Sequence, residues 1–262
     1  MRKNIPIIFI ILCLFFTVNK ISAQENSIQT SYRIFEKDYR YYQSLIETFN
    51  TAKSKNLQYN SVTSQAEYLQ ASKNLLMSEI NSLISFTVFL KLKLSDSTKI
   101  LKYNESTLYL KLDDENAFLN NFKENIIKIS TLEENKISWK TFKTHYLTVK
   151  NIAFRSKSLI EIIQGNKILD DISDIQDKMS VYLDDKKQDD LGTKAANDKL
   201  TGLAAKLILS ANNIKSAENL QGGFRLEDAD KNSSAIRNVL NQFCLNNQQI
   251  ISGYENIINT LQ

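Results

Sequence analysis

Apolar side chains recur at alternating steps of four and three residues through most of the chain, and this spacing limits the folds open to it. The first series comprises Ile28, Tyr32, Phe35, Tyr39, Tyr42, Ile46 and Phe49. Such steps keep successive side chains on one side of an α-helix, whereas a half-buried strand needs strict alternation. The only proline, Pro6, precedes the series and therefore interrupts no later segment. The spacing predicts long helices.

The same series answers a question raised by residues 32–43, whose sequence YRIFEKDYRYYQ combines aromatic and basic side chains. Such a mixture could form a surface on which nucleic-acid bases stack. The aromatic residues of the series share one helix face, however, while Arg33, Lys37 and Arg40 fall away from it. Aromatic residues at helical spacing are typical of a core. Only Tyr41, which lies off that face, is expected to be exposed.

Later segments repeat the pattern. Its members are Val62, Ala66, Leu69, Leu76, Ile80, Leu83, Leu90 and Leu94; Leu108, Leu112, Leu119, Phe122, Ile126 and Ile129; Trp139, Phe142, Tyr146, Val149, Ala153, Ile160 and Ile163; Ile168, Ile172, Ile175, Met179 and Tyr182; Leu200, Leu203, Leu207, Ile214 and Ala217; Ile236, Leu240, Phe243, Ile250, Tyr254, Ile257 and Leu261. Lys73, Thr87 and Asn247 are polar members. The fold is predicted to be all-α, with about six or seven helices in elongated antiparallel bundles packed like coiled coils.

Local signals place the ends of these helices. The sequences SQAE (64–67) and TLEE (131–134) match capping boxes, and the link at residues 57–61 is short enough for an antiparallel hairpin. Gly165 and Asn166 are expected to interrupt or bend a helix, and Gly222 and Gly223 to end one. Residues 24–130 and 131–262 are predicted to form two bundles, with one continuous bundle as the alternative.

The N-terminus resembles a secretory signal. Arg2 and Lys3 precede an apolar stretch over residues 5–16, and Ser22 and Ala23 supply small residues before Gln24. Residues 1–23 are therefore predicted to be a signal peptide. Cys13 could instead mark a lipoprotein, although Leu12 stands where a small residue is expected. No later stretch approaches a membrane span, so the protein is expected to be exported to the periplasm, the cell surface or the medium.

Removal of that signal changes the charge balance. It takes 33 basic residues to 30, against 29 acidic ones, because residues 1–23 hold three basic residues and no acid. A nearly neutral chain gives no support for nucleic-acid binding. It also leaves Cys244 as the one cysteine, which excludes an internal disulfide. Cys244 is predicted to be buried and inert, with a free thiol or an intermolecular crosslink as alternatives.

Catalytic and metal-binding patterns are missing from the sequence. The one histidine, His145, has Phe142 rather than a carboxylate three residues earlier, and no phosphate loop or HExxH motif occurs. Asp228 and Asp230 open a sequence like a calcium loop, but Ser233 replaces its glycine and Val239 its closing glutamate. Those aspartates are instead expected to favour the start of the last helix. We expect no enzyme, no cofactor and no metal.

Charge is distributed unevenly between residues 136 and 190. Five lysines form a predicted stripe, hereafter the lysine stripe: Lys136, Lys140, Lys143, Lys150 and Lys157. Eight aspartates follow: Asp170, Asp171, Asp174, Asp177, Asp184, Asp185, Asp189 and Asp190. The two sets could be solvated faces, or could attract each other. Alternatively, the lysine stripe could dock an anionic envelope polymer, lipid headgroups or an acidic protein.

The stretches FEKDYRYYQSLIETFNTAKSKNLQYNSVTSQAEYL and TLEENKISWKTFKTHY resemble an uncharacterised group of exported, all-helical bacterial proteins. The shared features are an aromatic-rich first helix, a link that here runs from Tyr59 to Thr63, and a Thr-Leu-Glu-Glu helix start. The resemblance covers about the first half of the chain and implies a helical architecture without an assigned activity. The hairpins also resemble, more loosely, extracytoplasmic four-helix sensor domains.

Two functions follow as expectations. The first is an exported, non-enzymatic helical bundle that acts as an envelope or extracellular interaction or structural module. The second is an extracytoplasmic ligand-binding bundle, similar to a sensor, that signals through a partner. A pocket between the helices lined by Tyr, Arg and Asn would favour the second, and a uniformly tight core would count against it.

Overall fold

The computed structural model describes residues 23–101, 106–185 and 191–261, which form six α-helices and one short 3₁₀ helix. The elements are α2 (Ala23–Tyr59), α3 (Val62–Leu101), α4 (Ser106–Lys128), α5 (Leu132–Asp185), α6 (Leu191–Gly222), η1 (Leu226–Asp228) and α7 (Ala229–Leu261). No strand occurs in these ranges. The predicted all-α class is confirmed. Of the predicted signal, only Ala23, the first residue of α2, lies within the described residues.

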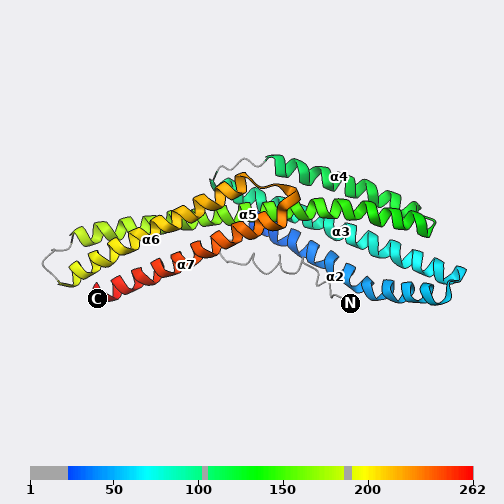
Figure 1. The fold of residues 1–262 in the computed structure, drawn as a ribbon, viewed down its shortest axis with the longest axis horizontal. Coiled ribbons are helices and arrows are strands. Elements are labelled where there is room, and N and C mark those ends of the chain that lie inside the picture. The colour runs from blue at the N-terminus through cyan, green and yellow to red at the C-terminus, as the bar shows by residue number, and fades with distance from the viewer. Residues whose placement is uncertain (1–22, 102–105, 186–190, 262) are drawn as a thin grey trace.

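The helices lie along one long axis, so the molecule is elongated (Figure 1). α2, α3, α4 and the first half of α5 form one end, and the second half of α5 packs with α6 and α7 at the other. α5 has 54 residues and contributes to both bundles. The predicted division of the chain at residue 131 stays a prediction, although one helix packs in both parts.

Four clusters of buried apolar residues follow one another along the molecule. Two of them join α3, α4 and α5, around Ile80 and around Leu112. The other two join α5, α6 and α7, around Ile236 and around Ile257. The predicted series supplied most of these residues. On α2, Phe35 and Tyr39 are buried while Tyr41 is 59% exposed, as the helical spacing predicted.

Parts of two predicted series are wrong. Val62, at 85% exposed, and Ala66 lie at the tip of the α2–α3 hairpin, which extends beyond α4 and α5 (Figure 1). No third helix covers them there.

The expected interruption at Gly165 and Asn166 is also wrong, because α5 continues through both residues. Its buried side passes through Gly165, Ile172 and Leu183, whereas Ile168, Ile175 and Tyr182 are exposed. Gln176 lies on that buried side, where its side chain accepts a hydrogen bond from the Tyr254 hydroxyl at 2.8 Å and donates one to Leu200 O at 3.3 Å. Apolar spacing alone predicted the wrong buried side for this part of α5, because position 176 on the true buried side is polar.

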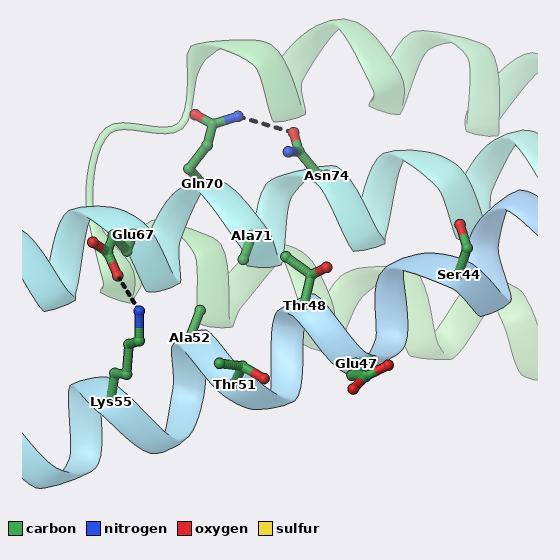
Figure 2. Close-up of a pocket in the computed structure, with 10 residues that line it drawn as sticks. All are labelled: Ser44, Glu47, Thr48, Thr51, Ala52, Lys55, Glu67, Gln70, Ala71 and Asn74. Carbon is green, nitrogen blue, oxygen red and sulfur yellow. Dashed lines mark hydrogen bonds and ion pairs between the residues drawn. The ribbon is translucent and has the colours of Figure 1, made fainter.

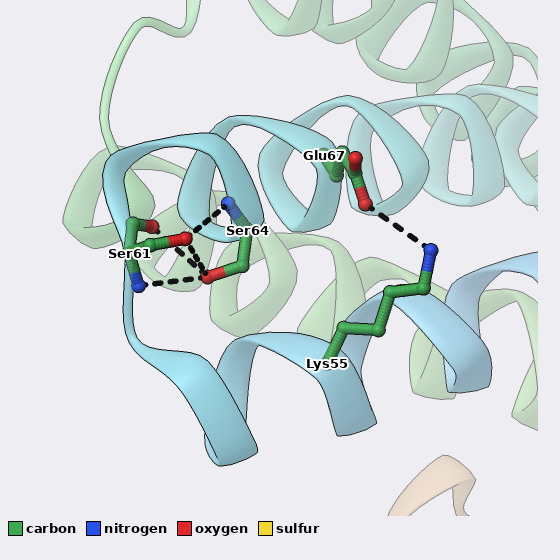
Figure 3. A network of polar contacts seen from close by, with 4 residues as sticks. All are labelled: Lys55, Ser61, Ser64 and Glu67. Atoms are coloured by element: carbon green, nitrogen blue, oxygen red, sulfur yellow. Dashed lines mark hydrogen bonds and ion pairs between the residues drawn. The ribbon is translucent and has the colours of Figure 1, made fainter.

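The start of α3 differs from its predicted capping box. Ser61, not Ser64, is the capping residue: Ser64 N–H donates to Ser61 Oγ at 3.2 Å, and Ser61 N–H donates to Ser64 Oγ at 2.9 Å. Ser64 thus takes the reciprocal position usually held by Glu or Gln. Figure 3 shows that Glu67 instead reaches across the hairpin to Lys55, at 3.6 Å.

The capping box at the start of α5 is confirmed. Glu134 N–H donates to Thr131 Oγ1 at 3.2 Å, and the Glu134 carboxylate accepts the backbone N–H groups of Ser130 and Thr131 at 2.8 and 3.0 Å. These backbone donors, Ser130 first, lower the pKa of Glu134. The C-terminal end of α6 at Gly222 is likewise as predicted.

Lys73, a polar member of an apolar series, stabilises the end of α4. Its ammonium group donates hydrogen bonds to the carbonyl oxygens of Ile127 and Ile129, at 3.0 and 2.7 Å. These carbonyls lie where a helix has no internal donors and where its dipole favours a cation. We expect Lys73→Met to lower the free energy of unfolding by about 1 kcal/mol, measured by urea denaturation. A matched Lys37→Met change, on the exposed side of α2, should have little effect. Equal losses in both variants would contradict the capping role.

α3 over Val62–Ser97 is long and apolar enough to cross a membrane by length and composition, and half of its most apolar stretch is buried in the structure. The expectation that no segment after the signal approaches a membrane span therefore fails on that criterion. The sequence pattern has a second explanation, since α3 packs against α2, α4 and α5. The core helix of a soluble protein meets the same criterion.

Candidate ligand-binding groove

A groove lies between α2 and α5, with α3 as its floor. Both helices pack against α3, but their Cα atoms nowhere come within 8 Å of each other in the described residues. Side chains bridge the gap at one end, where the rings of Phe49 and Trp139 lie with centroids 6.4 Å apart. Large aromatic side chains therefore separate two helices that smaller residues would let pack together.

The groove contains a cavity of about 630 Å³. Its lining residues are Phe35, Tyr39 and Tyr42 from α2; Glu79, Ser82, Leu83 and Phe86 from α3; and Trp139, Lys140, Phe142, Lys143, Tyr146, Leu147, Val149, Lys150 and Ala153 from α5. Small-molecule sites have volumes of roughly 300–1,000 Å³ and mostly apolar and aromatic walls. The cavity matches both criteria, and we call it the aromatic groove.

Ring contacts continue from helix to helix along the aromatic groove. Phe35 on α2 lies 5.2 Å from Phe86 on α3, centroid to centroid, and Tyr39 lies 6.1 Å from Tyr42. Such aromatic pairs are worth about 0.5–1.5 kcal/mol beyond the area they bury. The walls are thus held by contacts within them and do not depend on an occupant.

Glu79 is the acidic residue of the aromatic groove. It is partly buried on α3 and lines the cavity. Burial raises the pKa of its carboxyl group to about 7, and no cation of the described residues offsets this. Removing an ionised carboxylate from water is costly unless a donor or a cation accompanies it. Glu79 consequently has no ion-pair partner among the described residues, although lysines line the same cavity.

Three tyrosines surround this carboxyl group. Burial, followed in Tyr42 and Tyr146 by the charge of Glu79, raises the pKa of each of these two phenols. Burial also raises the pKa of Tyr39, an effect that Gln43 partly offsets and Glu79 adds to. The Tyr39 hydroxyl is buried and makes no hydrogen bond of ordinary geometry within the described residues. Phenol rings from α2 and α5 therefore lie within electrostatic range of one carboxyl group.

Lysines line the other side of the aromatic groove. Lys140 and Lys143 are exposed. Lys150 is partly buried, with its ammonium group 3.4 Å from an Asp230 carboxylate oxygen and 5.2 Å from the centroid of the Phe154 ring. Two lysines thus keep exposed side chains at the groove, while the third is engaged by α7 and by its own helix.

The structure divides the predicted lysine stripe. Lys136 is exposed and lies 3.9 Å from Glu133, whereas Lys157 is 2% exposed and lies 3.5 Å from Glu161. Burial, with Glu161 opposing it, lowers the pKa of Lys157. Seven residues fall about 20° short of two full helical turns, so successive lysines of the stripe lie progressively further round α5. The last of them faces the second bundle. Lys157 is therefore removed from the predicted docking surface.

Of the eight aspartates predicted as possible partners, the six that the structure describes do not pair with the lysine stripe. Asp170, Asp171, Asp174, Asp177, Asp184 and Asp185 lie on the second half of α5, and all six are exposed. Asp189 and Asp190 lie outside the described residues. The acids that approach the stripe are Glu133, Asp230 and Glu161. The solvated-face interpretation fits the six described aspartates.

His145 and Cys244 lie apart from the aromatic groove. His145 is partly buried against α4, where its Nδ1 lies 2.8 Å from a Glu115 carboxylate oxygen and its ring stacks on Phe118. Cys244 is exposed, so the prediction of a buried thiol is wrong. Its neighbour Phe243 takes the core position, which turns Cys244 outward.

The sequence that resembles a calcium loop is helical. Asp228 ends η1, Asp230 lies in the first turn of α7, and the Asn232 side chain donates to Arg225 O at 3.1 Å. Within the described residues, no group of three or more histidine, cysteine, aspartate or glutamate side chains could hold a metal ion. The position of both aspartates at the start of α7 agrees with the electrostatic interpretation.

A second groove, between α2 and α3, differs in chemistry. Its volume is about 610 Å³, and its lining residues are Ser44, Glu47, Thr48, Thr51, Ala52, Lys55, Glu67, Gln70, Ala71 and Asn74. Figure 2 shows Lys55 paired with Glu67, and the Gln70 side chain donating to Asn74 at 2.9 Å. Several of its polar groups are already paired with one another, so few remain to bind a ligand.

The sequence predictions missed the aromatic groove, although they identified many of its residues as core. Tyr39, Phe142 and Tyr146 lie on the predicted apolar faces, and Glu79 precedes the core residue Ile80. One feature of the sequence could have indicated the groove. Large aromatic residues are frequent on α2 and α5, and α3 between them carries Glu79.

Comparisons with known protein families, with curated protein sequences and with solved structures find no match to this chain. The resemblance to exported helical proteins stays a prediction.

Proposed function

We propose that this protein is an exported, non-enzymatic helical bundle that binds a small, largely apolar molecule in the aromatic groove. The observation that carries the proposal is the cavity of about 630 Å³ between α2 and α5. The grooves between α2 and α3 and between α6 and α7 are lined mostly by polar residues, so they lack this aromatic surface. A cavity lined by aromatic rings is retained at a cost in packing, which a bound apolar molecule offsets.

The test is a titration with N-phenyl-1-naphthylamine, a neutral dye whose fluorescence rises in apolar surroundings. We expect saturable binding at one site in the folded protein. Ser82→Phe adds a ring at the floor of the aromatic groove, where Ser82 is buried. That variant should weaken dye binding at least tenfold, since the ring takes the space the dye needs.

Ser44→Phe is the matched control. It makes the same change in the polar groove between α2 and α3, where Ser44 is exposed. Dye binding should remain within twofold of the unmodified protein, and circular dichroism melts would check that both variants fold. Equal dye affinity in the two variants, or no saturable binding to the unmodified protein, would overturn the proposal.

Docking of an anionic polymer or protein is a second candidate function. It is supported by Lys136, Lys140 and Lys143, which are exposed on one part of α5. Polyanion binding that is lost in Lys140→Gln/Lys143→Gln and at high salt, but retained in Ser82→Phe, would favour this candidate over the aromatic groove.

A further inference from the structure

We propose that the aromatic groove recognises an organic ammonium ion, with the Glu79 carboxylate as its counter-charge and the rings of Tyr39, Tyr42 and Tyr146 around it. This inference rests on the proposed function and names the ligand class: a small molecule with one substituted ammonium group and an apolar remainder.

The first support is the isolation of Glu79. Its carboxyl group has no hydrogen bond or ion pair within the described residues, and burial accounts for its raised pKa. The lysines that line the same groove form no ion pair with it, and Lys150 is paired with Asp230 instead. A cation that entered the aromatic groove would find an acid without a partner.

The second support is the kind of surface around this acid. Aromatic rings attract cations through their electron-rich faces. Tyr39 and Tyr42 approach from α2, and Tyr146 approaches from α5. Phenol rings on both sides of a carboxylate are suited to an ammonium ion whose methyl or methylene groups pack against them.

The same surroundings disfavour other ligands. A metal ion needs several oxygen, nitrogen or sulfur ligands, whereas Glu79 is the one acidic residue among those that line the cavity. Beside Glu79 an anion would be repelled once that residue is ionised, whereas the exposed Lys140 and Lys143 would attract it to their own part of the groove. The cavity also exceeds the size of a bare ammonium group, so Phe35 and Phe86 remain available to an apolar substituent.

The experiment compares phenyltrimethylammonium with tert-butylbenzene, its uncharged isostere. Each competes with N-phenyl-1-naphthylamine for the full chain, at pH 6 and pH 8. We expect the ammonium compound to bind at least tenfold more tightly than the isostere at pH 8, with a smaller ratio at pH 6. The pH effect follows from ionisation of Glu79 between these values.

Other ionisable groups near the site do not account for such a pH effect. The three phenols have raised pKa values, so they stay neutral at pH 8. The lysines of the groove come from α5, and the Lys140→Gln/Lys143→Gln variant tests their contribution. His145 also lies on α5, but it faces Glu115 on α4.

Glu79→Gln keeps the shape of the acid and removes its charge. In this variant the preference for the ammonium compound should fall at least tenfold at pH 8 and lose its pH dependence, while tert-butylbenzene binds as before. Lys140→Gln/Lys143→Gln is the control for charge at the groove, and it should retain or increase the preference.

The outcomes separate the two proposals. If both compounds displace the dye equally, or Glu79→Gln leaves their ratio unchanged, the ammonium site is wrong while the apolar site stands. If neither compound nor the dye binds, both proposals fail.

Discussion

Glu79→Gln is expected to raise the free energy of unfolding by about 3 kcal/mol at pH 8 and to change it little near pH 4. The pKa of this carboxyl group is about 7 in the folded chain, against a reference value of 4.5. Between these values the folded chain holds a proton that the unfolded chain has lost, so stability falls as the pH rises. Each pKa unit corresponds to about 1.4 kcal/mol, which gives the size of the effect.

Urea denaturation from pH 4 to pH 8 measures this difference. The unmodified protein should lose stability through the interval while Glu79→Gln does not. Glu134→Gln is a control of opposite sign, because the pKa of Glu134 is lowered and its stabilisation is lost as the pH falls through that lowered pKa. Parallel pH curves for Glu79→Gln and the unmodified protein would show that Glu79 is not destabilised by burial. A more stable variant that no longer binds the ammonium compound would also separate folding from recognition.

Gly253→Ala is expected to lower the free energy of unfolding by about 2 kcal/mol. A methyl group at position 253 of α7 would lie 2.8 Å from Leu203 Cδ1 and 3.1 Å from Leu203 Cγ on α6, and would also meet Cδ2. The whole end of the leucine side chain must then move in a packed interface. Overpacking of this kind costs about 1–3 kcal/mol, and it exceeds the gain in helix propensity from replacing glycine.

Gly165→Ala is the matched control for that prediction. A methyl group there would lie 2.5 Å from Ile214 Cδ1, with Phe243 Cε1 at 3.5 Å. The terminal methyl of Ile214 can shift by rotation about one bond, so the expected change is within about 1 kcal/mol of zero. Thermal and urea denaturation measure both variants. The prediction is wrong if Gly165→Ala loses as much unfolding free energy as Gly253→Ala. The loss would then not depend on whether the new methyl group meets one terminal atom or several atoms of the neighbouring side chain.

The helices were predictable because apolar spacing is a local property of the chain. Phe35, Leu112 and Ile236 are buried where their series placed them. The buried face of the second half of α5 was not predictable. Gln176 completes that face through hydrogen bonds to Tyr254 and Leu200, which a hydrophobic pattern does not reveal. Likewise, Gly165 favours a helix end in isolation, whereas in the structure it admits Ile214 and Phe243 from the neighbouring helices.

The aromatic groove could not be predicted from the sequence for a different reason. Tyr39 and Phe142 have the spacing of core residues whether their rings pack together or line a cavity. The difference depends on the distance between α2 and α5, which the packing of both helices against α3 sets. The lysine stripe failed in part for the same reason, since Lys157 becomes buried only where the second bundle covers α5.

The middle of α5 is covered on nearly every side. Between residues 152 and 163 only Arg155 and Glu161 are not buried. If either bundle unfolds, apolar side chains of α5 become exposed, and the other bundle packs against the same helix. The unfolding free energies of the two bundles are therefore coupled. A molecule held near Glu79 stabilises the folded state by mass action, and through α5 it also stabilises the contacts of Tyr254 in the other bundle. If the aromatic groove binds a molecule as proposed, its occupancy is expected to reduce fluctuations in the other bundle without a change of shape.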